Sequence, residues 1–143
     1  MIAVDTNLLV YAHRRESQFH AAAAQLIRDY AEGDAAWAIP WPCIYEFFSV
    51  VTNPRIWGNR ASRPQSARDQ IAAWTSAPTL RLLSETAHFE ETLLAFLRSP
   101  RIRGPIVHDA RIAALCAAHG VEELLTKDRD FQLFPQLKTR DPL

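Results

Sequence analysis

The sequence predicts an α/β protein, built as a three-layer α/β/α sandwich around a mostly parallel sheet of four to five strands. Short apolar runs alternate along the chain with longer segments whose apolar residues recur at helical spacing. The short runs are apolar at successive positions, which is typical of inner strands covered on both faces. With 143 residues and a hydrophobic content of 48%, the chain fits a single domain spanning residues 1–143.

The first ten residues contain the first predicted strand and the start of the first helix. Residues 2–4 are apolar throughout, and Asp5 follows them at the carboxyl end of the strand. Ligands of open α/β sheets bind at that edge, so Asp5 is a candidate site residue. The alternative is that Asp5 only caps the helix that follows, because Asp is among the preferred capping residues.

The next predicted elements are a helix over about 19–32, a strand over 35–39 and a helix from about Pro42 to Thr52. Glu46 is the one charge in this last, otherwise apolar, helix. Since desolvating a lone charge costs roughly several kcal/mol, we expect this carboxylate to be paired, coordinated to a metal or protonated. The alternatives are a partner arginine or a narrow polar stripe that leads the side chain to solvent.

The second half of the chain begins with an arginine-rich loop and then returns to regular elements. We expect a helix over about 64–76, a strand over 79–83, helices over about 86–98 and 106–119, a strand over 123–126 and an edge strand at 137–140. Three arginines in the connecting segments are candidates for phosphate contact, although they also suit a solvated surface: Arg55, Arg101 and Arg103.

Acidic residues recur after predicted strands or near the starts of helices, at Asp5, Glu46, Asp109, Asp128 and Asp130. Such positions share one edge of a doubly wound sheet, although Asp109 also suits the dipole of its helix. Converging carboxylates repel one another unless cations neutralise them. Ligation by oxygen alone selects Mg²⁺ or Mn²⁺ rather than zinc. The pattern therefore predicts metal-assisted hydrolysis or transfer at phosphorus.

Charge and cysteine usage narrow the class of protein further. The 16 basic and 16 acidic residues balance, so any attraction to nucleic acid must be local. Cys43 and Cys116 lie in apolar surroundings without a paired motif, which predicts buried reduced thiols and a cytoplasmic location. The chain lacks a basic leader and an apolar run of about 18 residues, so we expect neither secretion nor a membrane span.

Four segments carry these acids in a fixed order: Val4–Asn7, Tyr45–Phe47, Val107–Ala114 and Thr126–Phe131. Together they resemble the PIN-domain ribonucleases, and they are closest to the VapC toxins of bacterial toxin–antitoxin pairs. The resemblance spans nearly the whole chain. It implies an endoribonuclease toxin, dependent on Mg²⁺ or Mn²⁺, that inhibits translation by cutting transfer or ribosomal RNA. It also implies a cognate antitoxin and a homodimer.

The resemblance assigns roles to individual residues. Asp5, Glu46, Asp109 and Asp128 match the catalytic, metal-binding quartet of the family, and Asp130 matches a frequent additional metal-binding acid. Polar residues that orient water or substrate are matched by Thr6, Asn7 and Thr126. Lys127 departs from the family pattern, because a small polar residue is frequent at that position.

Two other classes of function remain open at this point. A phosphatase of the haloacid dehalogenase type also begins with an Asp after a strand, but it needs a second Asp two residues later, where this chain has Asn7. A non-catalytic α/β signalling or binding module could use Asp5 as a phosphate acceptor. That interpretation leaves Glu46 unexplained.

Overall fold

The structure, a computed structural model, describes residues 1–143 and contains one five-stranded sheet. The strands are β1 (Ile2–Val4), β2 (Trp37–Pro40), β3 (Leu80–Leu83), β4 (Glu123–Leu125) and β5 (Thr139–Arg140). They are ordered β3-β2-β1-β4-β5, and every neighbouring pair is parallel. The predicted α/β class with a mostly parallel sheet is confirmed, and the parallel arrangement is complete.

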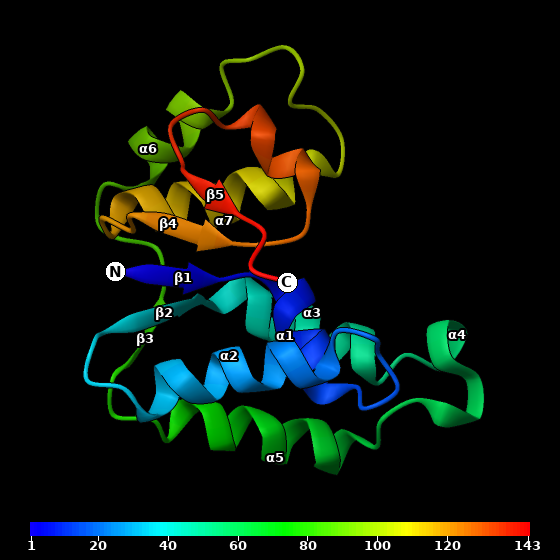
Figure 1. Cartoon of the computed structure of the whole chain (residues 1–143). Helices are drawn as coiled ribbons and strands as arrows, with labels where there is room; N and C mark the ends of the chain where they lie inside the picture. The colour runs from blue at the N-terminus through cyan, green and yellow to red at the C-terminus, as the bar shows by residue number, and fades with distance from the viewer.

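Helices cover both faces of this sheet. They are α1 (Thr6–His13), α2 (His20–Glu32), α3 (Trp41–Val51), α4 (Pro54–Trp57), α5 (Pro64–Thr75), α6 (Phe89–Phe96) and α7 (Ile106–Ala118), with 3₁₀ turns η1 (Gly58–Arg60) and η2 (Arg129–Leu133). Figure 1 shows α1, α2, α3 and α5 on one side of the sheet and α6 and α7 on the other. Because crossovers between parallel strands are right-handed, the reversal of direction between β3 and β4 moves the later helices to the opposite face.

Most predicted elements agree with the structure to within a few residues, and two regions differ. The helix predicted over 86–98 extends only over α6, and its first predicted turn is irregular. The segment predicted as a loop after residue 52 contains α4 and η1. The side chain of Asn53 caps α4 by accepting a hydrogen bond from the backbone N–H of Arg55 at 2.9 Å. Such a short helix has no apolar periodicity by which to recognise it.

The core lies between the sheet and the two helical layers. Residues of the inner strands, such as Val4, Ile39 and Leu124, are fully buried, as expected for strands covered on both faces. Cys43 and Cys116 are buried free thiols, which confirms that prediction. Burial raises the pKa of Cys116 to about 12. None of the helices combines the length and the apolar character needed to cross a bilayer.

Phe47 links α3 to the elements around it and offers a test of this packing. It is fully buried, and its ring lies edge-on to Trp74 of α5, with ring centroids 4.8 Å apart. We expect Phe47→Ala to lower the free energy of unfolding by about 3–5 kcal/mol, because it leaves a cavity. Urea denaturation measures this change. The exposed Ser49 on the same helix provides the control, and a loss in Ser49→Ala equal to that in Phe47→Ala would contradict the assigned packing.

Candidate active site

The candidate site lies at the carboxyl ends of β1 and β4, where the strand order reverses. β1 lies between β2 and β4, so the connections from neighbouring strands leave on opposite sides (Figure 1). This is the switch point at which open α/β sheets bind ligands. Asp5 directly follows β1, and Thr126 and Asp128 follow β4. Glu46 comes from α3, and Asp109 comes from the first turn of α7.

Asp5 is the buried centre of the site, with only 4% of its surface exposed. One carboxylate oxygen accepts the backbone N–H of Thr6 at 2.7 Å, and the other accepts the Thr126 hydroxyl at 2.6 Å and the Asn7 amide at 3.0 Å. Burial raises the pKa of Asp5 to about 6, against the lowering effect of the hydrogen bonds. Asp5 is also the N-cap of α1, so the predicted capping role is confirmed and coexists with a position in the pocket.

Thr126 connects the two strand ends through its hydroxyl group. That hydroxyl donates to Asp5 and accepts hydrogen bonds from the Asn7 amide at 3.0 Å and from the backbone N–H of Asp128 at 2.9 Å. The carbonyl oxygen of Asn7 in turn accepts the backbone N–H of Lys127 at 3.3 Å. Thr126 and Asn7 therefore fix the position of a carboxylate and of the loop after β4. The sequence predicts polar residues here, but it does not reveal these partners.

Glu46 lies on the solvent-facing stripe of α3. Tyr45 and Ser49 are exposed beside it, whereas Phe47 is buried on the opposite face of the helix. The premise of a desolvated carboxylate is therefore wrong, and the exposure agrees with the polar-stripe alternative, while metal coordination by Glu46 stays a prediction. The Glu46 carboxylate accepts the Thr6 hydroxyl at 2.7 Å, which holds it beside the start of α1. No arginine or lysine pairs with it.

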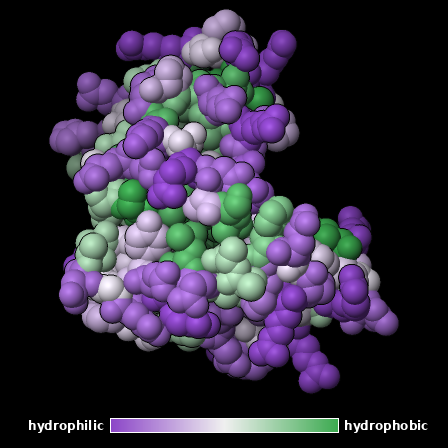
Figure 2. All heavy atoms as spheres, in the orientation of Figure 1, coloured by the Kyte–Doolittle hydropathy of each residue, from purple (hydrophilic) through white to green (hydrophobic).

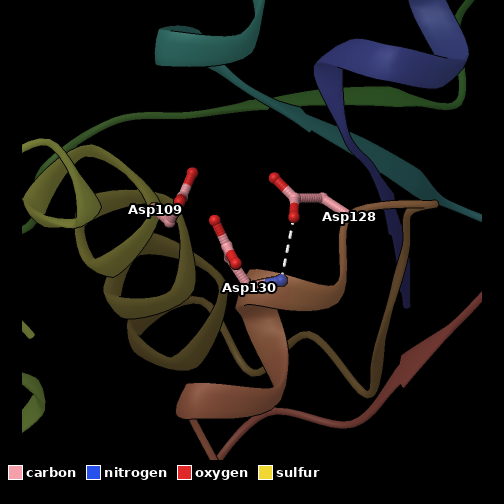
Figure 3. A group of neighbouring side chains, drawn as sticks. All are labelled: Asp109, Asp128 and Asp130. Carbon is pink, nitrogen blue, oxygen red and sulfur yellow. Dashed lines mark hydrogen bonds between the residues drawn. The ribbon is translucent and has the colours of Figure 1, made fainter. Parts of the chain in front are cut away.

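Asp109, Asp128 and Asp130 form a compact group of carboxylates between α7 and the turn after β4 (Figure 3). One oxygen from each lies within 4.8 Å of the oxygens from the other two. The backbone N–H of Asp130 donates to Asp128 at 2.8 Å, which fixes this turn. Burial raises the pKa of Asp109 to about 7, and the neighbouring negative charges, led by that of Asp128, contribute to the rise.

A cavity of about 250 Å³ lies between Asp5 and Glu46 on one side and the carboxylate group that includes Asp109 and Asp128 on the other. It is lined by Asp5, Thr6, Asn7, Val10, Tyr11, Glu46, Val50, Asp109 and Asp128. All four acids of the predicted quartet thus face one pocket, and Asp130 adjoins it through the carboxylate group. Val10, Tyr11 and Val50 form an apolar wall that the sequence does not reveal, because apolar residues in helices usually indicate core packing.

The side chains present fit a hard divalent cation. The close group offers carboxylate oxygens only, without cysteine or histidine. Oxygens within 4.8 Å of one another can share one ion, because such ions bind oxygen at roughly 2.0–2.6 Å. No lysine or arginine forms an ion pair with Asp109, Asp128 or Asp130, so their negative charge is not balanced by the chain itself.

The basic residues predicted near the site lie outside the cavity. The Lys127 ammonium binds Asp141 at 2.7 Å and lies 4.4 Å from the ring centroid of Phe19. Its charge is thus engaged away from the acids of the pocket. The three arginines predicted to contact phosphate are exposed, and none lines the cavity: Arg55, Arg101 and Arg103.

Known proteins resemble this chain over nearly its whole length. The PIN domain family matches residues 2–137. Ribonuclease VapC48 of Mycobacterium tuberculosis is 32% identical over 138 residues, covering 96% of this chain and 94% of that protein. Ribonuclease VapC43 of the same species is 31% identical over 143 residues, covering 100% of this chain and 96% of that protein.

Solved structures share the fold at lower identity. Mycobacterium tuberculosis VapC20, a Sarcin-Ricin loop cleaving toxin, has a TM-score of 0.69 at 20% identity, covering 99% of this chain and 100% of that one. VapBC2 from Rickettsia felis, bound to a promoter DNA fragment, has a TM-score of 0.68 at 18% identity, covering 98% of each chain. At these identities the likeness establishes the fold alone.

The raised pKa of Asp109 predicts how stability depends on pH when no metal is bound. An Asp side chain ordinarily titrates near 3.8, whereas the folded protein holds the Asp109 proton up to about pH 7. Between these values the folded state binds more protons than the unfolded state, so stability falls as pH rises. We expect the free energy of unfolding, relative to that of Asp109→Asn, to fall between these two pH values.

Urea unfolding at several pH values, in the presence of a chelator, measures this difference. Asp34→Asn changes an exposed acid far from the cavity and provides the control, which should follow the unsubstituted protein at every pH. A difference between the unsubstituted protein and Asp109→Asn that stays constant with pH would contradict the raised pKa.

Proposed function

The chain belongs to the PIN domain family and, within it, to the VapC ribonucleases, and on that premise we propose how its acids cleave RNA. It is an endoribonuclease toxin that hydrolyses RNA phosphodiester bonds. The proposal assigns catalysis to Asp5, Glu46, Asp109 and Asp128. The observation that carries this assignment is that the four carboxylates, from four separate segments of the chain, line one cavity.

We propose that these acids, together with Asp130, hold Mg²⁺ or Mn²⁺. Such an ion supplies a Lewis acid that stabilises charge on phosphate oxygens and lowers the pKa of water. In the metal-free protein the Asp109 carboxyl holds a proton below about pH 7, so the cation competes with that proton. Ion binding is therefore expected to tighten as pH rises toward that value.

The chain's own side chains orient the reacting groups. Asp5 lies beneath the cavity with its carboxylate fixed by four donors, the Cys43 thiol among them, so it loses little orientational freedom when substrate binds. Glu46 and Asp128 are exposed, so the phosphodiester enters from their side. The apolar wall at Val10 and Val50 limits access of bulk water to the inner end of the cavity.

Substrate and partners follow from the same family membership. We propose transfer or ribosomal RNA as the substrate class, with phosphate contacts from Arg55, Arg101 and Arg103. Figure 1 shows that α4, which carries Arg55, and the connection between α6 and α7, which carries the other two, lie far apart on either side of the strand ends. A long RNA could thus be held on both sides of the pocket.

A cognate antitoxin is the proposed protein partner. Two structural neighbours are VapBC assemblies, from Rickettsia felis and Salmonella typhimurium. The homodimer implied by the resemblance stays a prediction, as does the cytoplasmic location. Family membership removes the two alternatives considered from the sequence, the haloacid dehalogenase-like phosphatase and the non-catalytic module.

Loss of a single carboxylate tests the assigned chemistry. We expect Asp5→Asn and Asp109→Asn each to lower RNA cleavage by at least about 100-fold, because each removes a negative charge proposed to hold the cation that stabilises the transition state. Cleavage is measured by mapping new RNA ends after incubation with purified protein and Mg²⁺ or Mn²⁺. A chelator should abolish cleavage by the unsubstituted protein. Full activity in Asp5→Asn would refute the assignment, and Asp34→Asn serves as the control.

Thr126 provides a finer test, because its hydroxyl makes three hydrogen bonds. We expect Thr126→Val to lower kcat about tenfold, since losing a hydrogen bond to a charged group costs about 1.5–3 kcal/mol and only part of this falls on the transition state. Thr126→Ser keeps the hydroxyl and should restore most of the rate. Thr126→Val keeps the methyl group and Thr126→Ser keeps the hydroxyl, so equal losses in the two variants would contradict the role assigned to the hydroxyl.

A further inference from the structure

A second hollow, of about 370 Å³, lies at the opposite end of α1 from the acids. It is lined by His13, Arg14, Arg15, Glu16, Arg60 and Ser62, and none of these is apolar. Glu16 is paired with Arg14, whereas Arg15 and Arg60 are exposed and have no ion-pair partner. The hollow therefore has a surplus of positive charge.

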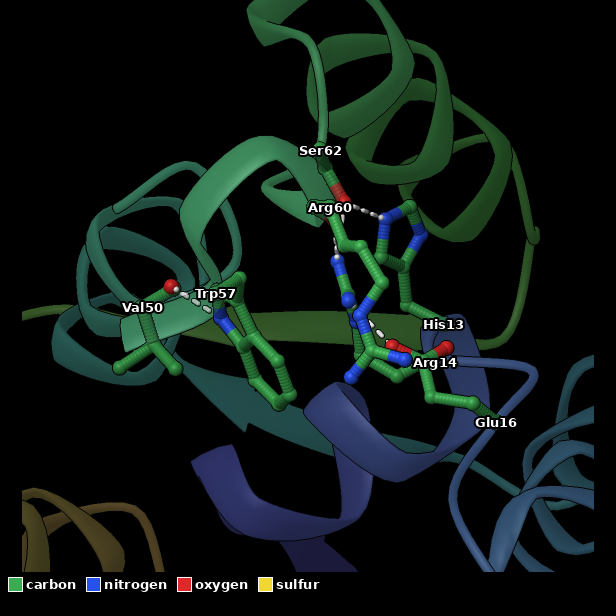
Figure 4. Close-up of polar contacts among 7 residues, drawn as sticks. All are labelled: His13, Arg14, Glu16, Val50, Trp57, Arg60 and Ser62. Carbon is green, nitrogen blue, oxygen red and sulfur yellow. Dashed lines mark hydrogen bonds and ion pairs between the residues drawn. The ribbon is translucent and has the colours of Figure 1, made fainter. Parts of the chain in front are cut away.

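The hollow has a buried cationic floor (Figure 4). Arg14 is only 6% exposed, and its guanidinium donates to the backbone carbonyl of Arg60 at 2.7 Å and to the Ser62 hydroxyl at 3.3 Å. The same guanidinium lies 4.0 Å from the ring centroid of Trp57. Its Nε atom is buried without a partner. The Arg14 charge is paired with Glu16, so the unsatisfied group is the Nε donor alone, and burying it without a partner costs free energy.

Residues 53–62, here called the arm, form one wall of the hollow and project from the body of the protein (Figure 1). The surface over the arm is mostly hydrophilic (Figure 2). Gly58 has φ of 59°, a left-handed conformation that lets the chain turn after α4. The Trp57 indole N–H donates to the backbone carbonyl of Val50 at 2.8 Å, and Val50 lines the acidic cavity. The arm is therefore fixed to the wall of that cavity.

The distance between the acidic cavity and the basic hollow can be spanned by a few nucleotides of a single strand. Arg14 is nine positions after Asp5 along α1, which at a rise of 1.5 Å per position is about 14 Å. At the rise of about 3.4 Å per nucleotide of a B-form strand, about four nucleotides span this distance. One strand can therefore occupy the acidic cavity and the basic hollow together.

We propose that Arg15 and Arg60 bind a backbone phosphate of the RNA substrate about four nucleotides from the bond that is cut. This inference rests on the proposed ribonuclease function and adds a binding site for substrate remote from the acids. Arginine suits the role because its planar fork matches phosphate oxygens. Proteins that hold single strands follow the backbone with such basic grooves.

The test uses the double substitution R15Q/R60Q, with R68Q/R81Q as a matched control at two exposed arginines elsewhere. Binding of a labelled single-stranded RNA of about twelve nucleotides, longer than the span required, is followed by fluorescence anisotropy over a range of salt concentrations in a chelator. An oligoglutamate peptide is titrated in parallel. Cleavage of RNA by the unsubstituted protein with Mg²⁺ or Mn²⁺ is measured separately.

We expect R15Q/R60Q to weaken RNA binding about tenfold at low salt and to reduce the slope of log Kd against log salt by about 0.7, which is the contribution of one lost phosphate contact. The control should match the unsubstituted protein. An unchanged slope overturns the inference, and so does a loss of oligoglutamate binding with RNA binding intact. If the expected slopes appear but the unsubstituted protein cleaves no RNA, the phosphate site stands and the proposed ribonuclease function fails.

Discussion

The burial of one negative charge, that of Asp5, is the constraint on which the rest of this structure depends. A buried carboxylate is tolerated only when donors satisfy it, and the donors here come from both sides of the switch point. Thr6 and Asn7 belong to the first turn after β1, whereas Thr126 follows β4. The Asp5 backbone N–H also donates to Leu125 at 3.0 Å, extending the pairing of the two strands. The centre of the site therefore forms only when the first and last parts of the chain come together.

The carboxylates around Asp5 lower the stability of the fold and favour the binding of a cation. Their mutual repulsion contributes to the raised pKa values of Asp5 and Asp109 after burial, and no basic side chain in the pocket relieves it. Both residues lie at the start of a helix, where the dipole favours negative charge and offsets part of this cost. The part of the repulsion that the helix dipoles do not offset destabilises the site at which a cation and a phosphate would bind. Strain of this kind is common at functional sites, because activity requires groups that the fold alone would not favour.

Features marked by repeating local signals are predictable from this sequence, whereas contacts that depend on tertiary structure are not. Strands and long helices are marked by apolar patterns, and the acids are marked by their positions at element ends, so the sheet edge was predictable. The burial of Arg14 is not predictable, because the groups that it contacts lie on the arm, at residues 57–62, far away along the chain. For Glu46 the sequence pointed to an unusual charge, but the helix exposes that side chain. Whether Glu46 is exposed depends on which face of α3 is turned toward solvent. The sequence does not define that face, because apolar residues lie on both sides of Glu46.

The positions of the two chain ends follow from the parallel sheet. The Met1 ammonium binds Glu122 at 2.7 Å, just before β4 begins, and so lies at the amino ends of the strands. The last residues follow β5 and lie at the carboxyl ends of the strands, where Asp141 binds Lys127 immediately before Asp128 (Figure 1). A purification tag or fluorophore joined after Leu143 would consequently crowd the mouth of the acidic cavity. Joined ahead of Met1, the same label sits at the far end of the molecule and leaves the mouth open.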